Sequence, residues 1–324
     1  MKVFVTGVSG CIGVSVSREL ISQGHEVVGI DTQDMPVAIN DSNFTHILGS
    51  ILDKTFLRDA LRGCDSVIHL AAHLGVKRTE KNRLRCLDIN VDGTRNILEA
   101  AQGARTVRKF IFASSSEVYG EPFSNPVTEQ SITQGKTIYA ISKLAGEELT
   151  KAFGEELKAF DTCILRFFNT YGIGQVGQFV ITRFVNNVLS GKSPIINGAG
   201  DQLRSYCFAE DTARGVVLAL QNPISSGKIY NIGSNSEPIT ILDLAKKIIS
   251  LSPSNSSLKP SVLGASFGDR DKSREIFFRH ADTSLARQEL SFQANISLDE
   301  GLKKLIDAGI GKKDWGTHEK NYEY

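Results

Sequence analysis

Two short segments of the sequence carry residues that together could oxidise an alcohol. The first is Ser114-Ser115-Ser116-Glu117-Val118-Tyr119-Gly120, and the second is Tyr139-Ala140-Ile141-Ser142-Lys143. A tyrosine with its ordinary pKa of about 10 is a weak base at neutral pH, but a neighbouring lysine ammonium stabilises the phenolate. The Ser115 hydroxyl could hold the substrate alcohol while Tyr139 removes its proton and a hydride leaves the same carbon. This chemistry requires an adjacent nicotinamide. The alternative is a chance match, because Tyr-x-x-x-Lys is common on helix surfaces.

The elements around these segments should bring them together. The apolar run from Lys109 to Ala113 predicts a buried strand, which would place Ser115 at its carboxyl end, where open α/β sheets bind ligands. A helical pattern runs from Tyr139 to Phe153, and a spacing of four puts Tyr139 and Lys143 on one helix face. We therefore expect the hydroxyl, the phenol and the ammonium to meet in one crevice.

The N-terminal segment has the pattern of a dinucleotide site. A short strand from Lys2 to Thr6 is followed by Gly7, Gly10 and Gly13 and by an amphipathic stretch from Val14 to Gln23. In this context the first glycine allows a turn, the second admits the pyrophosphate and the third lets helix and strand approach. The N–H groups at the start of the helix would face the phosphates. The predicted cofactor is a nicotinamide dinucleotide.

The second predicted strand, Glu26 to Asp31, ends in an acid. Its spacing from the glycines is typical of a carboxylate that binds the adenosine ribose hydroxyls, and a carboxylate repels a 2′-phosphate. The cofactor is therefore expected to be NAD rather than NADP. The alternative is that Asp31 is only a turn residue before Thr32.

The remaining pattern predicts a doubly wound parallel sheet, because strands and helices alternate as far as Gly174. Predicted strands cover 45–51, 66–72 and 162–169, and predicted helices cover 56–62 and 87–102. His69 lies in an apolar strand and is expected to be a core histidine. His73 to Glu80 reads as a polar loop that either contacts the substrate or is a solvated face. Beyond Gly174 the expected helices are 179–189, 211–220 and 241–250, the expected strands are 194–197 and 228–232, and 251–261 is an expected loop.

Composition excludes several classes of protein. The chain has 324 residues, 41% of them hydrophobic, and a net charge of +1, so there is no electrostatic case for binding nucleic acid or a membrane surface. Its five cysteines are scattered without a C-x-x-C pair, which indicates reduced thiols and no metal site. Neither a signal peptide nor a membrane span is evident, and a cytoplasmic protein is expected.

Over nearly its whole length the chain resembles the NAD-dependent nucleotide-sugar epimerase/dehydratase family, which are extended short-chain dehydrogenase/reductases. The motifs that carry the resemblance are Thr6-Gly7-x-x-Gly10-x-x-Gly13, Asp31, His69-Leu70-Ala71-Ala72, Asn90, Ser114 to Gly120, Tyr139-x-x-x-Lys143, Arg166-Phe167-Phe168-Asn169, Gln202-Leu203-Arg204 and Ala281-Asp282. The resemblance implies a Rossmann domain over 1–174, to which segments near 205–235 return. It implies a smaller α/β domain, mainly 175–324, for a nucleoside diphosphate sugar, usually a UDP-sugar. Members often form homodimers through the Tyr139 helix and the preceding one.

The family pattern also implies residue roles. The expected cofactor-binding residues are Gly7, Gly10, Cys11, Ile12, Gly13, Asp31, Ser50, Ile51, Leu70, Ala71, Ala72, Asn90, Tyr139 and Lys143. The expected substrate-binding residues are His73, Ser115, Ser116, Asn169, Phe179, Arg204, Lys272 and Arg274. Asn169 and Arg204 would contact the diphosphate. A second basic residue is expected shortly before Ala281, but Lys272-Ser273-Arg274-Glu275 replaces the usual Arg-Pro-Gly-Asp, which leaves Arg270, Lys272 and Arg274 as candidates.

By this resemblance, Tyr139 would remove the proton of the sugar 4-hydroxyl and leave a transient 4-keto sugar. The first expectation is a UDP-sugar 4-epimerase. Glu117 favours the alternatives, because dehydratases and UDP-glucuronate decarboxylases also carry Glu there, and it could act as an acid/base at C5. Against them, dTDP-glucose 4,6-dehydratases have Asp-Glu where this chain has Ser116-Glu117, and the decarboxylases follow their tyrosine with Gly-Lys-Arg, unlike Ile141 to Leu144. Glu117 could also be structural, and a non-catalytic NAD-binding scaffold is a remote alternative.

Overall fold

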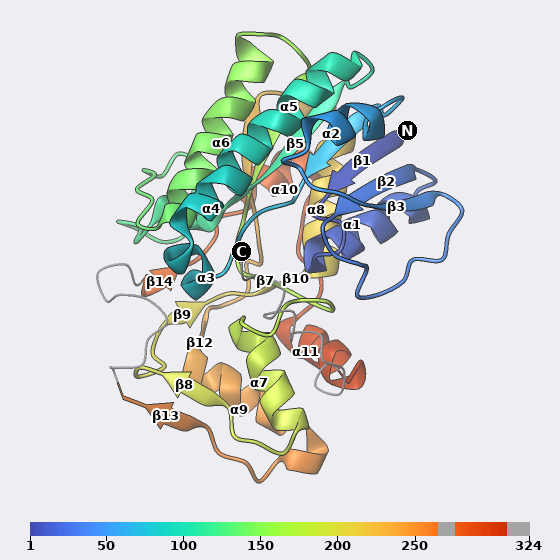
Figure 1. Cartoon of the computed structure of the whole chain (residues 1–324). Coiled ribbons are helices and arrows are strands. Elements are labelled where there is room, and N and C mark those ends of the chain that lie inside the picture. The colour runs from blue at the N-terminus through green and yellow to red at the C-terminus, as the bar shows by residue number, and fades with distance from the viewer. Residues whose placement is uncertain (265–275, 310–324) are drawn as a thin grey trace.

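A computed structural model, which describes residues 1–264 and 276–309, shows a parallel sheet of seven strands between two layers of helices (Figure 1). The strand order is β11-β6-β5-β4-β1-β2-β3, and every pair is parallel. The strands are β1 (Lys2–Thr6), β2 (Glu26–Asp31), β3 (Phe44–Leu48), β4 (Ser66–His69), β5 (Lys109–Ser115), β6 (Asp161–Phe167) and β11 (Lys228–Ile232). This arrangement confirms the predicted doubly wound sheet.

Helices cover both faces of the sheet because its central strands are apolar on both sides. One layer contains α1 (Cys11–Ser22), α8 (Ala209–Gln221) and α10 (Ser284–Leu290), which pack on a core that includes Val5, Ile111 and Leu165. The other contains α2 (Lys54–Ala60), α5 (Gly93–Ala104) and α6 (Ile138–Glu155), which pack on a core that includes Phe4, Phe110 and Ile164. Both faces of the sheet are thereby covered, and the carboxyl ends of its strands are the expected place for ligands.

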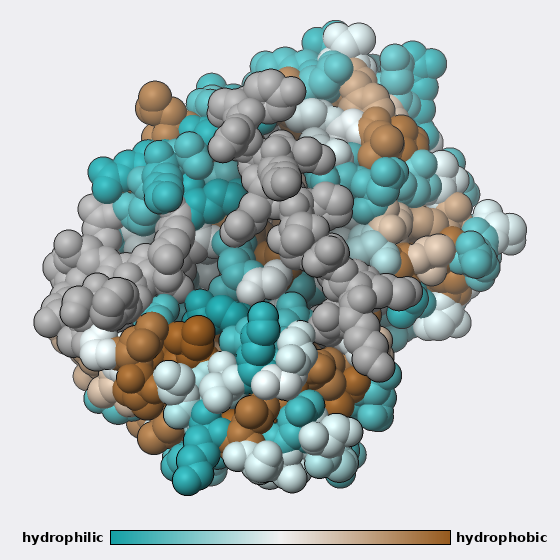
Figure 2. All heavy atoms as spheres, turned by 60° about the horizontal axis from the view of Figure 1, so that its bottom comes forward, coloured by the Kyte–Doolittle hydropathy of each residue, from teal (hydrophilic) through white to brown (hydrophobic). Residues whose placement is uncertain are grey.

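A smaller lobe follows the sixth strand (Figure 1). Its helices are α7 (Val180–Leu189), α9 (Ile241–Ser250) and α11 (Leu298–Asp307), and they share a separate apolar core. Its short strands are β8 (Ile195–Asn197), β9 (Leu203–Arg204), β12 (Ile239–Thr240), β13 (Ser261–Leu263) and β14 (Phe278–Arg279). Strands β7 (Thr170–Tyr171) and β10 (Cys207–Phe208) pair with each other, and 3₁₀ turns cover Pro223–Ser225 and Pro253–Asn255. Viewed from this lobe, apolar groups on the surface lie in patches separated by hydrophilic side chains (Figure 2).

Two local predictions were wrong. The segment His73 to Glu80 is not all loop, because α3 (Val76–Lys81) begins after Gly75, whose φ of 104° suits a glycine at that turn. The single helix expected over 87–102 is instead α4 (Arg83–Leu87), a π-helical turn (Asp88–Asp92) and α5. The π-helical turn contains Asn90, whose side chain is fully occupied by tertiary hydrogen bonds that a periodicity argument cannot anticipate.

Candidate active site

The carboxyl end of β5 and the start of α6 form one side of the candidate site. Ser115 ends β5, and its Oγ accepts a hydrogen bond from the Glu117 N–H at 3.2 Å, which begins a 3₁₀ turn (Ser116–Tyr119). The Glu117 carboxylate accepts the Thr137 hydroxyl at 3.2 Å, and Thr137 caps α6 by accepting the Ala140 N–H. Glu117 is therefore held at the start of the helix that carries Tyr139.

Tyr139, Lys143 and Ser115 come together. The Lys143 ammonium lies 5.9 Å from the centre of the Tyr139 ring, one helical turn away, and donates a 2.7 Å hydrogen bond to the Ala113 carbonyl oxygen. Ser115 lies close enough to the Tyr139 phenol to lower its pKa. Hydroxyl, phenol and ammonium therefore meet where β5 faces α6.

Burial dominates the titration of this group. It raises the pKa of the Tyr139 phenol above its usual range, the Glu117 charge raises that pKa further, and the Ser115 hydrogen bond and the Arg279 charge lower it. The expected lowering of this pKa by Lys143 stays a prediction, since desolvation is the largest cause acting on the phenol and it raises the pKa. Burial likewise lowers the pKa of Lys143 to about 8, although the Cys86 and Glu147 charges oppose it.

The glycine loop between β1 and α1 fits a dinucleotide diphosphate. A Cβ on Gly7 would lie 2.7 Å from the Ala71 nitrogen, and one on Gly13 would lie 2.3 Å from the Gly7 carbonyl oxygen. Gly10 is exposed at the N-terminal cap of α1, where a Cβ would meet only the Gly7 oxygen, at 3.2 Å. Gly7 and Gly13 thus permit close packing while Gly10 leaves the helix N-terminus open, with Cys11 and Ile12 in its first turn.

Asp31 closes the end of β2 beside this loop. Its two carboxylate oxygens accept the N–H groups of Ser9 and Gln33, each at 3.1 Å. Each oxygen keeps acceptor capacity for a ribose hydroxyl. Burial raises the pKa of Asp31, which these backbone hydrogen bonds oppose. Ser50 and Ile51 follow β3 at the same edge, and the Ile51 carbonyl oxygen accepts the Asn96 amide at 3.1 Å.

The loop after β4 is fixed by two polar side chains. The Thr6 hydroxyl accepts the Ala71 N–H at 3.1 Å, and the Thr6 carbonyl oxygen accepts the Leu70 N–H at 3.2 Å; Ala72 follows. The Asn90 amide accepts the His73 N–H at 2.7 Å and donates to the His73 carbonyl oxygen at 3.0 Å and to Ser142 at 2.9 Å. Asn90 therefore shapes the loop with a side chain that is already engaged by protein. The His73 ring accepts an Arg78 N–H at 3.1 Å, which places the proton of the neutral imidazole on Nε2.

The expected diphosphate residues occupy the lobe side of the site. Asn169 donates to the Ser205 carbonyl oxygen at 3.3 Å. The Arg204 guanidinium donates to the carbonyl oxygens of Leu203 at 2.8 Å and Phe277 at 2.9 Å, and also to that of Ile276. Phe179 is the N-terminal cap residue of α7. Lys272 and Arg274, together with Arg270, lie outside the described residues.

Arg279 is a functional candidate that the sequence reasoning missed. It lies in β14, which pairs in parallel with β9 so that Arg279 is opposite Arg204. Its guanidinium is buried, donates to the Ser116 carbonyl oxygen at 3.2 Å, and lies near enough to lower the pKa of Tyr139. Its position two residues before Ala281 fits a basic residue shortly before Ala281-Asp282 better than Arg270, Lys272 or Arg274 does.

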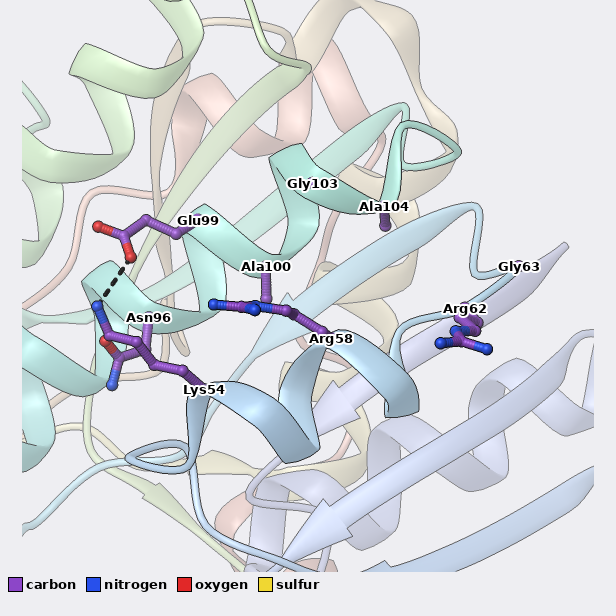
Figure 3. A pocket seen from close by; sticks show the side chains of 9 residues that line it. All are labelled: Lys54, Arg58, Arg62, Gly63, Asn96, Glu99, Ala100, Gly103 and Ala104. Atoms are coloured by element: carbon purple, nitrogen blue, oxygen red, sulfur yellow. Dashed lines mark hydrogen bonds and ion pairs between the residues drawn. The ribbon is translucent and has the colours of Figure 1, made fainter.

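A separate hollow lies between α2 and α5 (Figure 3). It measures about 450 Å³ and is lined by Lys54, Arg58, Arg62, Gly63, Asn96, Glu99, Ala100, Gly103 and Ala104. Lys54 is paired with Glu99 at 3.0 Å, and none of the lining residues belongs to the Tyr139 group. In the described parts of the chain no helix is long and apolar enough to cross a membrane, and no three His, Cys, Asp or Glu residues are grouped as metal ligands.

Comparisons with known proteins agree with this geometry. Residues 3–233 match the model of the "NAD dependent epimerase/dehydratase family". The chain is 32% identical over 317 residues to a UDP-N-acetyl-alpha-D-glucosaminuronate decarboxylase from Bacillus cytotoxicus, covering 94% of this chain and 96% of the relative.

Two solved structures show the same similarity. The Bacillus cereus UDP-glucuronic acid 4-epimerase in complex with UDP-glucuronic acid and NAD has a TM-score of 0.84 at 31% identity and covers 96% of this chain and 99% of its own. DesIV, a dTDP-glucose 4,6-dehydratase from Streptomyces venezuelae, has a TM-score of 0.85 at 27% identity and covers 98% and 99%. The chain therefore belongs to the NAD-dependent epimerase/dehydratase family, and it is an NAD-dependent enzyme of the group that comprises nucleotide-sugar epimerases, dehydratases and decarboxylases.

Proposed function

We propose that the substrate is a UDP-hexuronate, which the enzyme oxidises at C4 and then decarboxylates. The observation that carries this proposal is the buried Arg279 guanidinium, which donates to the Ser116 carbonyl oxygen and lowers the pKa of Tyr139. A guanidinium matches a carboxylate in charge and in its paired hydrogen-bond geometry. A sugar whose C4 hydroxyl faces Tyr139 carries its C6 substituent on the adjoining carbon, so Arg279 can select a C6 carboxylate. The similarity to the glucosaminuronate decarboxylase supports this substrate class.

The first step uses the Tyr139 group. Tyr139 takes the proton of the C4 hydroxyl, Ser115 hydrogen-bonds that oxygen, and the Lys143 charge stabilises the phenolate. NAD, when bound, supplies the hydride acceptor at C4 and the hydride that is later returned. The residues proposed to hold it are those of the glycine loop together with Asp31, Ser50, Ile51, the Leu70 to Ala72 segment, Tyr139 and Lys143. Asn90 would contribute through the loop that it shapes.

The second step uses Glu117. A C4 ketone makes the C6 carboxylate a β-keto acid, so the C5–C6 bond breaks, carbon dioxide leaves and the electron pair passes to C5 and the C4 oxygen. C5 must then gain a proton, and Glu117, which lies close enough to raise the pKa of Tyr139, is the acid that we assign. Return of hydride to C4 and of the proton from Tyr139 restores the alcohol and yields a UDP-pentose.

A 4-epimerase is the second candidate. It is favoured by the sequence after Tyr139, which lacks Gly-Lys-Arg, and by the similarity to the UDP-glucuronic acid 4-epimerase. In that reaction the ketone turns over and receives hydride on its other face, and Glu117 would then be structural. A dehydratase would use Glu117 to remove the C5 proton and would eliminate water instead of carbon dioxide.

We assign the UDP moiety to the smaller lobe, following the sequence prediction that 175–324 mainly binds the nucleotide sugar and that 1–174 binds NAD. Arg204 and Asn169 are the proposed diphosphate contacts, with Lys272 or Arg274 as the second basic residue. His73, Ser116 and Phe179 are proposed to shape the sugar pocket. Names of relatives and neighbours that specify UDP-sugars support the choice of nucleotide.

A homodimer is proposed through α5 and α6, as the family resemblance implies. The exposed Ile141 of α6, with 50% of its surface accessible, supports an apolar contact there. An Ile141→Lys variant should then be smaller than wild type in light scattering. All five cysteines are free, which supports the expected reducing, cytoplasmic compartment.

The test of the reaction is product mass. Purified enzyme is incubated with UDP-glucuronate, UDP-N-acetylglucosaminuronate and UDP-glucose, without added NAD and again with it. Loss of carbon dioxide from a uronate is the expected result. An isomer of unchanged mass would establish the 4-epimerase, and conversion of UDP-glucose alone would overturn the uronate assignment.

A further inference from the structure

A buried ion pair lies one helical turn beyond Lys143. Glu147 of α6 and Arg166 of β6 are 1% and 4% exposed, and their pairing is bidentate, with Nε–Oε1 at 2.9 Å and Nη2–Oε2 at 2.7 Å. Ser114 precedes Ser115, and its hydroxyl donates to Glu147 Oε1 at 2.5 Å. Tyr139, Lys143 and Glu147 are spaced by four and share one face of the helix. The pair therefore fixes this face against the ends of β5 and β6.

Hydrogen bonds connect the same ion pair to the other segments that carry site residues. Arg166 donates to the Tyr119 hydroxyl at 2.9 Å, and Tyr119 donates to Asn231 at 2.7 Å. The Asn231 amide donates to the carbonyl oxygens of Val127 at 3.0 Å and Asp282 at 3.3 Å. Val127 in turn bridges to Ala281, two residues after Arg279. The turn with Glu117, the helix with Tyr139 and the strand with Arg279 are thus joined through buried hydrogen bonds.

Four titratable side chains of the described residues lie around the Lys143 ammonium. Cys86 from α4, Tyr139 and Glu147 from α6 and His69 from β4 are the titratable groups around it. His69 is neutral, because burial lowers its pKa to about 3, and burial raises the pKa of the Cys86 thiol. Glu147 is the carboxylate among these groups. Its charge, like that of Cys86, opposes the loss of the Lys143 proton that burial favours.

We propose that Glu147, held by Arg166, is a positioning residue of the reaction, which sets the catalytic face of α6 and keeps the Lys143 ammonium charged. It acts through Lys143 and Tyr139 rather than on the sugar. This role rests on the shared C4 oxidation and not on whether decarboxylation or epimerisation follows.

The test is the pH profile of kcat/KM for Glu147→Gln, measured with whichever UDP-sugar the wild type converts. Glu148→Gln is the matched control, since Glu148 is the next residue on α6, its side chain is 73% exposed, and it pairs with Lys151 at 2.7 Å. We expect Glu147→Gln to move the alkaline limb of the profile to lower pH, because the Glu147 charge opposes the loss of the Lys143 proton. Glu148→Gln should leave the limb in place, and NAD content should equal that of wild type in both.

Removing one partner of a buried pair leaves the other charge uncompensated and can prevent folding. The double variant Glu147→Gln/Arg166→Met avoids this. It should lower the limb by less than Glu147→Gln does, because the opposing charge of Arg166 is removed together with that of Glu147. A uniform loss of kcat/KM with the limb unmoved would reduce Glu147 to a structural residue and overturn the proposal. An equal shift in Glu148→Gln would also overturn it. If no UDP-uronate is decarboxylated but another UDP-sugar is converted, the proposed function fails while this test still decides the role of Glu147.

Discussion

The Lys143 ammonium lies 5.9 Å from the centre of the Tyr139 ring, and both side chains come from consecutive turns of one helix. The ammonium is also anchored at 2.7 Å to the Ala113 carbonyl oxygen, on the strand that ends in Ser115. This relationship places a cation beside a phenol whose pKa is raised by burial. The reaction therefore depends on whether Lys143 keeps its proton.

The pH dependence of the free enzyme follows from this. Burial lowers the pKa of Lys143 to about 8, so the protonated, active form is lost as pH rises through that value. We predict that kcat/KM falls above about pH 8. The pH dependence of kcat/KM reports on the groups of the free enzyme. Lys143→Arg, whose guanidinium stays charged, should lose this alkaline limb. Retention of the limb in Lys143→Arg would show that another group titrates.

Tyr139→Phe removes the proposed base and keeps the ring. General acid–base catalysis typically contributes 10²- to 10⁴-fold, so we expect kcat to fall by roughly that factor. NAD content, read from absorbance, and the dissociation constant for UDP should stay at the wild-type values. Full turnover by this variant would exclude Tyr139 as the base.

Arg279→Met tests the selection of a uronate. Losing a charged hydrogen-bond partner of the substrate should lower kcat/KM for a UDP-uronate by about 100-fold, with a much smaller effect on UDP-glucose. Arg287→Met, at an exposed position of α10, is the control. Equal losses for charged and neutral sugars would mean that Arg279 supports the fold instead of the substrate.

Two glycines offer a matched stability test. An alanine Cβ at Gly13 would lie 2.3 Å from a backbone oxygen, and we expect Gly13→Ala to cost about 1–3 kcal/mol of unfolding free energy and to weaken NAD binding. At Gly103, inside α5, a Cβ meets nothing within 4 Å, so Gly103→Ala should stabilise by up to about 1 kcal/mol. Urea unfolding and NAD titration measure both effects. The reverse order of stability would contradict the packing of the loop.

His69 should make the protein sensitive to acid. Its ring binds Thr6 at 2.7 Å and Thr94 at 3.0 Å, and burial lowers its pKa to about 3. As the pH falls, His69 gains a proton near pH 6.5 in the unfolded chain but not in the folded chain. The contribution of His69 to stability is therefore present above pH 6.5 and is lost as the pH falls towards 3. At pH 5 the unfolding free energy is lower by about 2 kcal/mol, since each pH unit below 6.5 costs about 1.36 kcal/mol. Urea unfolding of His69→Asn should show a smaller loss between pH 7 and 5, and an unchanged loss would exclude His69 as its source.

Local pattern identified most of the elements that position the site. Apolar runs marked the sheet strands, and the spacing of Tyr139 and Lys143 placed them on one helix face. Periodicity failed at Asn90, where tertiary hydrogen bonds to His73 and Ser142 accompany a π-helical turn. It also failed at Val76–Lys81, a six-residue helix within a polar stretch.

The sequence by itself determined the sheet, the NAD pattern and the residues able to oxidise an alcohol, because each depends on residue types at short, regular spacings. Only the tertiary structure decided the electrostatics, since the raised pKa of Tyr139 and the lowered pKa of Lys143 arise from desolvation by distant segments. It also placed Arg279 beside Ser116, although 162 residues separate them in the chain, because β14 pairs with β9 and returns the chain to the end of β5. No spacing rule covers such a contact, and it is the one that bears most directly on the choice of sugar.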